Sequence, residues 1–161
     1  MNDLTFRTEL RPGDVGWLIH RHGVVYAAEW GFDPTFEAYV AEPLAKFVKC
    51  RTERERLWIA ELDGKPVGWI AVVTAETDTA QLRWFLVEPE ARGKGVGKKL
   101  FTEAVMFCRQ VGYTTAMLWT VDRLTTAAKL YRDFGFSMVE EKPDGHGWAG
   151  SVEQKYELRL A

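Results

Sequence analysis

The sequence predicts an α/β (α+β) domain with a mixed, largely antiparallel central sheet of about seven strands flanked by about four helices. Segments of alternating apolar and polar residues, typical of half-buried strands, are interspersed with segments whose apolar residues recur every three or four positions, typical of helices. Three of the predicted strands follow one another with only short turns between them, which makes them antiparallel neighbours. The chain has 161 residues, 47% of them hydrophobic, and this suits one core. We therefore expect a single domain over residues 1–161.

The first predicted elements are a strand and a helix. Residues 4–10 (LTFRTEL) alternate apolar and polar side chains, and Pro12 with Gly13 ends that strand. From Asp14, a candidate N-cap, apolar residues follow a helical spacing as far as Gly31, which fits a helix end.

A second helix is expected to begin after Asp33, its N-cap, with Pro34 in the first helical position. Its apolar face extends to Val48. Pro43 lies inside this pattern and removes a backbone N–H donor, so we expect it to kink or divide the helix.

A three-stranded antiparallel meander follows the two helices. Residues 57–62 and 66–75 are predicted strands joined by Asp63-Gly64, a strong hairpin signal, and a third strand ends at Val87. The remaining expected elements are a helix over about 95–111, a strand over 115–121, a helix over 125–134, a short strand over 137–140, a turn-rich loop over 142–151 and a final strand over 152–158.

Residues 81–100 (QLRWFLVEPEARGKGVGKKL) run from an apolar strand through a glycine-rich turn into an amphipathic helix. Gly93, Gly95 and Gly97 let the backbone approach a ligand closely, and a helix start offers unpaired N–H groups that favour phosphate. Their G-x-G-x-G spacing differs from the dinucleotide fingerprint G-x-G-x-x-G, and no G-x-x-x-x-G-K-[ST] occurs. A tight turn without a ligand is the alternative interpretation.

Two segments resemble those of the GNAT superfamily of N-acetyltransferases. Arg92, Gly95 and Gly97 match its acetyl-CoA-binding motif, R/Q-x-x-G-x-G/A. Residues 127–136 (AAKLYRDFGF) resemble its A-x-x-L-Y-x-x-x-G-F segment, and the predicted order of elements is also that of the family. Residues 10–40 are in addition similar to the acetyltransferase half of bacterial proteins in which a MarR-type DNA-binding regulator is fused to a GNAT domain.

This resemblance implies an N-acetyltransferase that moves an acetyl group from acetyl-CoA to a primary amine by direct attack in a ternary complex. In the family, acetyl-CoA is held by a strand end and the loop after it. The corresponding residues here are Phe85, Leu86, Val87, Arg92, Gly93, Lys94, Gly95, Val96, Gly97 and Lys98.

The resemblance also suggests a catalytic residue. Tyr131 matches the family's frequent tyrosine acid, which would protonate the leaving sulfur, although a tyrosine packed in the core is the alternative. Leu124 stands where many relatives have an Asn that binds the pantetheine arm, and Trp119 stands where some have a Glu base. The general base is therefore unassigned: a water chain ending on a carboxylate such as Glu29 is one candidate. His22 is another, and it equally fits a core histidine.

The acceptor is expected to be a small-molecule or peptide amine of open identity, and an acyl group longer than acetyl is also left open. In the family the first two helices and the loop between them flank the acceptor groove, so Tyr26, Trp30 and Phe32 are predicted to wall an aromatic pocket. Two other functions stay open. One is a CoA- or ligand-sensing regulatory module without turnover, and the other is a degenerate domain that only contacts a protein partner.

Composition excludes several other classes of function. A net charge of -2 and a pI near 6.0 argue against nucleic-acid and anionic-membrane partners. No apolar run approaches the roughly 18 residues of a membrane span and no secretion signal is present, so a cytoplasmic protein is expected. Cys50 and Cys108 lie far apart, and His20 and His22 are only two residues apart, so we expect no metal site. A homodimer and a functional link to a MarR-type regulator are left open.

Overall fold

The computed structural model describes residues 3–143 and 145–160 and contains the predicted seven-stranded sheet. Its strand order is β1-β2-β3-β4-β5-β7-β6, in which every neighbouring pair is antiparallel except β4 and β5. The elements are β1 (Leu4–Arg7), α1 (Asp14–Trp30), α2 (Pro34–Cys50), β2 (Arg56–Leu62), β3 (Lys65–Glu76), β4 (Thr79–Val87), η1 (Pro89–Ala91), α3 (Val96–Gln110), β5 (Thr115–Val121), α4 (Thr125–Asp133), β6 (Ser137–Lys142), η2 (Trp148–Gly150) and β7 (Glu153–Arg159). The predicted fold class is confirmed.

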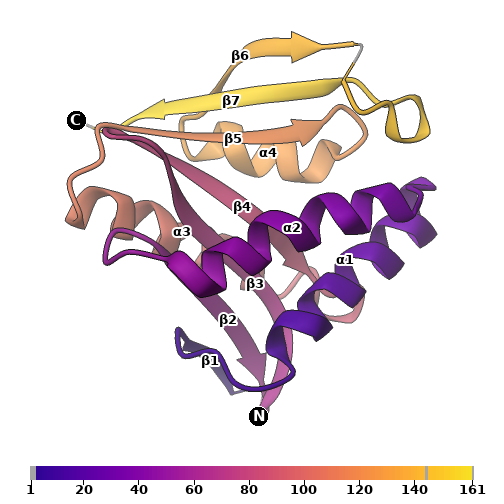
Figure 1. The fold of residues 1–161 in the computed structure, drawn as a ribbon. Coiled ribbons are helices and arrows are strands. Elements are labelled where there is room, and N and C mark those ends of the chain that lie inside the picture. The colour runs from indigo at the N-terminus through magenta and orange to yellow at the C-terminus, as the bar shows by residue number, and fades with distance from the viewer. Residues whose placement is uncertain (1–2, 144, 161) are drawn as a thin grey trace.

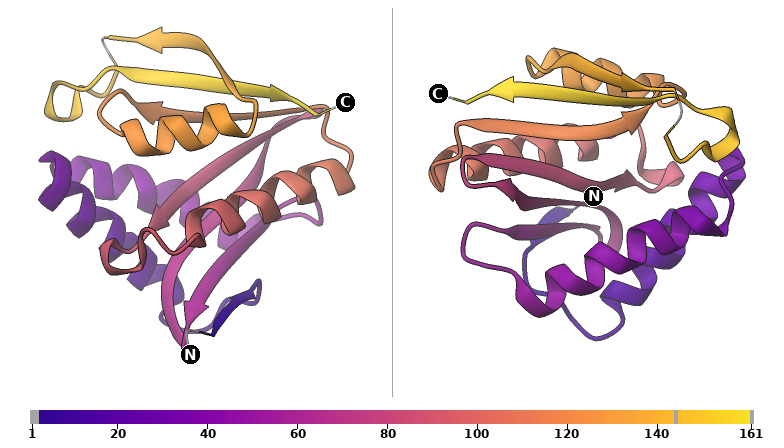
Figure 2. Two further views of the ribbon diagram at one scale, coloured as in Figure 1. Left: turned by 180° about the vertical axis from the view of Figure 1, so that it is seen from behind. Right: turned by 45° about the horizontal axis from the view of Figure 1, so that its top comes forward.

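The helices cover both faces of the sheet. Figure 1 shows α1 and α2 in front of the sheet, and the left view of Figure 2, seen from behind, shows α3 and α4 on the opposite face. Leu18 and Leu44 bury one core beneath α1 and α2, and Leu100 and Phe101 bury the other beneath α3 and α4. The apolar faces expected from the helical spacing thus pack on opposite sides of one sheet.

The start of α1 differs from its prediction. The strand ends at Arg7 rather than residue 10, and Gly13 rather than Asp14 is the N-cap of α1. The Asp14 carboxylate instead accepts hydrogen bonds from the Arg7 guanidinium at 2.6 and 2.9 Å, and this pairing holds the pKa of Asp14 below its usual value. A side chain engaged in an ion pair with the strand is not free to cap the helix.

The helix α2 begins as predicted, because the Asp33 side chain accepts from the Thr35 N–H at 2.9 Å and Pro34 takes the first helical position. The expected division at Pro43 is wrong, since α2 continues without interruption from Pro34 to Cys50. Val40, Leu44 and Phe47 are buried on both sides of Pro43 along the helix, and this burial offsets the hydrogen bond that the proline removes.

The meander of β2, β3 and β4 is confirmed. Asp63 and Gly64 both have positive φ, 52° and 79°, as the two-residue turn of a tight hairpin requires.

A β-bulge in β4 reverses the direction in which its side chains point. The register with β3 shifts opposite Trp69 to Ala71, and Trp84 has a φ of 54°. Before the bulge Leu82 packs under α3 and α4, whereas after it Trp84 and Leu86 pack under α1 and α2. Two consecutive side chains, Arg83 and Trp84, therefore lie on the α1 and α2 face.

The sheet opens between β4 and β5. These parallel strands pair only where Thr79–Gln81 meet Thr115–Met117, and Figure 1 shows them spreading apart beyond that point. Beyond Gln81, the edge of β4 that faces β5 has no strand partner within the described residues, while the other edge stays paired with β3. This opening places free backbone groups beside the functional site.

Candidate active site

An outer cavity of about 450 Å³ lies beside the open end of the sheet. Its walls come from the end of β4, the loop that precedes α3, the start of α4 and the end of α1. Every residue that the sequence predicted for the acyl-donor site lines this cavity except Lys94, which is exposed on the same loop. The structure thus brings together residues from Phe85 to Lys98.

The glycine-rich loop fits a ligand that approaches the backbone. Gly93 and Gly95 both have a φ of 77°, and an added Cβ at either position would meet nothing within 4 Å. An added Cβ on Gly97, in contrast, would come within 3.3 Å of the Phe85 ring, so this glycine allows the start of α3 to pack closely against β4. The first two glycines therefore serve the turn, and the third serves the packing.

The start of α3 presents free hydrogen-bond donors. Gly95 is the N-cap and no side chain caps it. Within the part of the chain that the structure describes, no hydrogen bond uses the N–H groups of Gly95, Val96 or Gly97. Such donors, together with the positive end of the helix dipole, favour an anionic group. Lys98 is exposed on the first turn and adds positive charge.

Two ion pairs tie α1 to this loop. The Arg21 guanidinium donates to both carboxylate oxygens of Glu88 at 2.7 and 2.8 Å, and Glu88 is buried. The Arg92 guanidinium donates to Glu29 at 2.6 Å and to the Val87 carbonyl at 3.3 Å. Glu29, a candidate base in the sequence, is therefore engaged with the loop at the rim of the outer cavity.

An inner cavity of about 110 Å³ lies between the α1 and α2 pair and the opened strands. Tyr26, Phe85, Leu124 and Tyr131 line both cavities, so the two share a junction. The inner lining is largely aromatic, with Phe36 in contact with Tyr26 at a ring-centroid distance of 4.5 Å. The two cavities therefore meet at these four residues, with Tyr131 among them.

A match to known proteins decides the family. The model of the acetyltransferase (GNAT) family matches residues 22–136. The chain belongs to this family. The membership predicted from the two motifs is confirmed.

Individual relatives agree with this assignment. An uncharacterised N-acetyltransferase of Schizosaccharomyces pombe is 30% identical over 118 residues, which cover 71% of this chain and 72% of that protein. An N-acetylaspartate synthetase of Danio rerio is 36% identical over 88 residues, which cover 54% of this chain but only 31% of that protein. The structure of a Salmonella typhimurium protein with its cofactor acetyl-CoA has a TM-score of 0.72 and 20% identity, covering 98% of this chain and 94% of that one. This likeness shows the GNAT fold.

Tyr131 lies at the junction of the two GNAT cavities. It is buried, and its ring packs against Phe101 at 5.4 Å and Tyr156 at 5.7 Å. Burial raises the pKa of its phenol, and the neighbouring Tyr26 adds to that rise. Tyr131 therefore keeps its proton at neutral pH and is a weaker acid than an exposed tyrosine.

The two positions at which the sequence departs from the GNAT pattern both contribute to the site. Leu124 lines both cavities and places an apolar side chain at the junction. Trp119 lines the inner cavity, and the Lys142 ammonium lies 4.6 Å from the centre of its ring. Neither side chain can act as a base.

Trp30 is separated from the two aromatic residues predicted with it. Tyr26 and Phe32 line the inner cavity, whereas Trp30 lines only the outer one. It packs against Tyr26 with 5.0 Å between ring centroids. The structure therefore places Trp30 on the side of the predicted acyl donor.

His22 lies at the inner cavity as a deeply buried histidine, 2% exposed. Its Nδ1 lies 3.2 Å from the Trp69 indole N–H, which can only donate, and 3.1 Å from the Leu18 carbonyl. Burial lowers the pKa of His22 to about 4. A neutral imidazole of such low pKa is a poor proton acceptor, which favours the core interpretation of this residue over the catalytic one.

We expect His22 to make the protein less stable in acid. Its folded pKa of about 4 lies below the ordinary 6.5, so the unfolded chain binds a proton that the folded one excludes. The contribution of His22 to the free energy of unfolding is thus fully present above pH 6.5. It is lost as the pH drops toward 4, which lowers the free energy of unfolding by up to about 3 kcal/mol. Urea unfolding at pH 7, 6 and 5 measures this slope. H22Q should flatten it and H20Q, at an exposed position, should not; an unchanged slope in H22Q would rule out this origin.

Sequence reasoning missed several residues of the inner cavity. Glu153, at the start of β7, is 8% exposed, and its carboxylate accepts from the His146 backbone N–H and lies 3.0 Å from His146 Nδ1. The His146 ring stacks on Trp148 at 4.2 Å. Arg83 and Thr120 line the same cavity. These side chains come from separate elements, so no local motif groups them in the sequence. The only indication in the sequence was the aromatic and histidine content of residues 142–151.

No three His, Cys, Asp or Glu side chains within residues 3–143 and 145–160 gather closely enough to hold a metal ion. None of the helices in the described part of the chain combines the length and the apolar character that a membrane crossing needs.

Proposed function

We propose that this GNAT protein transfers an acetyl group from acetyl-CoA to a primary amine by direct attack in a ternary complex. The observation that carries the proposal is the junction of the two cavities at Tyr131. A donor held in the outer cavity and an acceptor in the inner one would present their reacting ends to each other there. Such positioning is a major source of rate in a two-substrate reaction.

The outer cavity suits acetyl-CoA in three respects. We assign the free N–H groups of Gly95, Val96 and Gly97 to the pyrophosphate, with Lys94 and Lys98 adding charge. The unpaired edge at Phe85, Leu86 and Val87 offers backbone groups to the pantetheine arm. The Salmonella typhimurium structure, which holds acetyl-CoA on the same fold, supports this use of the cavity.

The chemistry needs a proton donor and a proton acceptor. Attack by the amine on the thioester carbonyl expels a thiolate, and we assign the delivery of a proton to that sulfur to Tyr131, which lines both cavities. The ammonium of the acceptor must also lose a proton. Glu153 is the carboxylate on the inner wall, and we assign it this role, through water where it does not reach the amine directly.

Calorimetric titration with acetyl-CoA, followed by a screen of primary amines for release of the CoA thiol, tests the proposal. We expect micromolar binding and amine-dependent thiol release. Binding without release by any amine would favour a CoA-sensing module, and the absence of binding would overturn the proposal. The homodimer and the link to a MarR-type regulator stay predictions from the sequence.

A further inference from the structure

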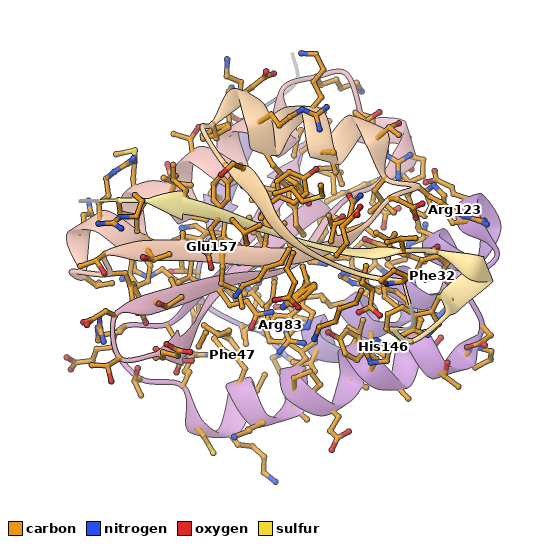
Figure 3. All side chains as sticks on the ribbon, turned by 90° about the horizontal axis from the view of Figure 1, so that it is seen from above. Phe32, Phe47, Arg83, Arg123, His146 and Glu157 are labelled. Carbon is orange, nitrogen blue, oxygen red and sulfur yellow. The ribbon has the colours of Figure 1, made fainter. Side chains whose placement is uncertain are left out.

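Arg83 presents a positive charge to the inner cavity. Arg83 lies next to Leu82 in β4 and on the opposite face of the sheet, where its guanidinium carbon lies 5.7 Å from the ring centre of Tyr39 and 5.2 Å from that of Trp84. In Figure 3, Arg83 and His146 both lie in the space between the sheet and α2. The aromatic rings hold the flat guanidinium in place by cation–π contact.

This charge has no acidic partner among the described residues. No ion pair and no hydrogen bond there involves the Arg83 guanidinium. The carboxylate on the same cavity wall, Glu153, is bonded to His146 instead. Burial lowers the pKa of Arg83, yet a guanidinium keeps its proton at any physiological pH. A partly buried, unpaired cation costs free energy unless an anion joins it.

We propose that the acceptor is an amino acid whose carboxylate pairs with Arg83. The inference rests on the proposed function, in which the acceptor amine occupies the inner cavity. A planar guanidinium binds a carboxylate through two parallel hydrogen bonds, which fixes orientation as well as adding affinity. The cavity wall then carries one group for each charge of a zwitterionic amino acid: Arg83 for the carboxylate and Glu153 for the ammonium.

The rest of the lining agrees with a small amino acid. The cavity measures about 110 Å³, so it holds a small acceptor. Phe32 and Phe36 offer apolar rings to a side chain, with 5.0 Å between their centroids. The carboxylate at Arg83 and the amine at the Tyr131 junction would place that side chain against these rings.

Calorimetry in the presence and absence of CoA tests the inference on binding itself. The probes are the twenty standard L-amino acids, β-alanine and 4-aminobutyrate, with 3-methylbutylamine and 2-phenylethylamine as the decarboxylated partners of leucine and phenylalanine. We expect at least one amino acid to bind saturably, and the amine or amide that lacks its carboxylate to bind about a hundredfold more weakly. Saturable binding by none of the probes, or equal binding of acid and amine, would overturn the inference.

The variant R83M keeps the side-chain packing on Tyr39 and Trp84 without the charge. It should bind the amino acid as weakly as the wild type binds the matching amine, with acetyl-CoA affinity unchanged. R56M is the matched control, because Arg56 also lies over aromatic rings, 4.4 Å from Phe107, but on β2. If R83M does not fold, the acid and amine pairs on the wild type still decide the question. Binding of an amino acid without release of the CoA thiol would overturn acetyl transfer but keep the Arg83 site. Thiol release at equal rates with the amino acid and with its decarboxylated amine would keep acetyl transfer but overturn the Arg83 site.

Discussion

G95A is expected to weaken acetyl-CoA binding by about a hundredfold. Gly95 has a φ of 77°, lines the outer cavity and is the N-cap of α3. A methyl group there would project into the space where the pyrophosphate is proposed to lie, and the strained backbone would move the N–H groups beside it. Loss of two charge-assisted hydrogen bonds is worth about 3 kcal/mol, or about a hundredfold in Kd. Calorimetric titration measures the change.

A matched control separates the ligand effect from backbone strain. Gly112 follows the opposite end of α3, has a φ of 90° and also has nothing within 4 Å of an added Cβ. G112A should lower the free energy of unfolding by about 1 kcal/mol, as G95A should, but it should keep the acetyl-CoA affinity of the wild type. Equal affinities in the two variants would mean that the glycine-rich loop does not hold the donor.

Features that depend on neighbouring residues could be predicted from the sequence. The Asp63-Gly64 turn, the Asp33 cap and the glycine-rich loop each follow from local backbone chemistry, and the structure contains all three. Asp14 shows the limit of such reasoning. A capping signal was present, but an ion pair with Arg7, on a separate strand, took the side chain. Tertiary contacts override a local preference of about 1 kcal/mol.

The inner cavity depends on contacts between distant parts of the chain. Arg83 and Glu153 come from strands 70 positions apart and line the cavity where β4 separates from β5, and the bulge of β4 adds Trp84 to the same lining. A bulge shifts every later side chain to the other face, and alternation in the sequence does not reveal it. Most residues of the outer cavity that were named from the sequence lie in one short continuous segment. In the inner cavity Tyr26, Phe32 and His22 were named from the sequence, whereas Arg83 and Glu153 were not.

Y131F is expected to lower kcat by between about a hundredfold and ten-thousandfold while leaving acetyl-CoA affinity unchanged. The ring of Tyr131 packs against Phe101 and Tyr156, and phenylalanine preserves those contacts. What is lost is the phenolic proton, which burial keeps in place at neutral pH. Removing a general acid from a step that expels a thiolate costs about two to four powers of ten.

Y156F provides the comparison that isolates this effect. Tyr156 is buried beside Tyr131 with 5.7 Å between ring centroids, and it lines neither cavity. Its hydroxyl can be removed with a similar disturbance of the core, so kcat should stay within about twofold of the wild type because no reacting group is touched. Thiol release at saturating acetyl-CoA, with Kd measured separately by calorimetry, distinguishes the two variants. If Y131F has the same kcat as Y156F, Tyr131 is not the general acid. Water would then protonate the leaving sulfur, and Tyr131 would be an aromatic residue of the core.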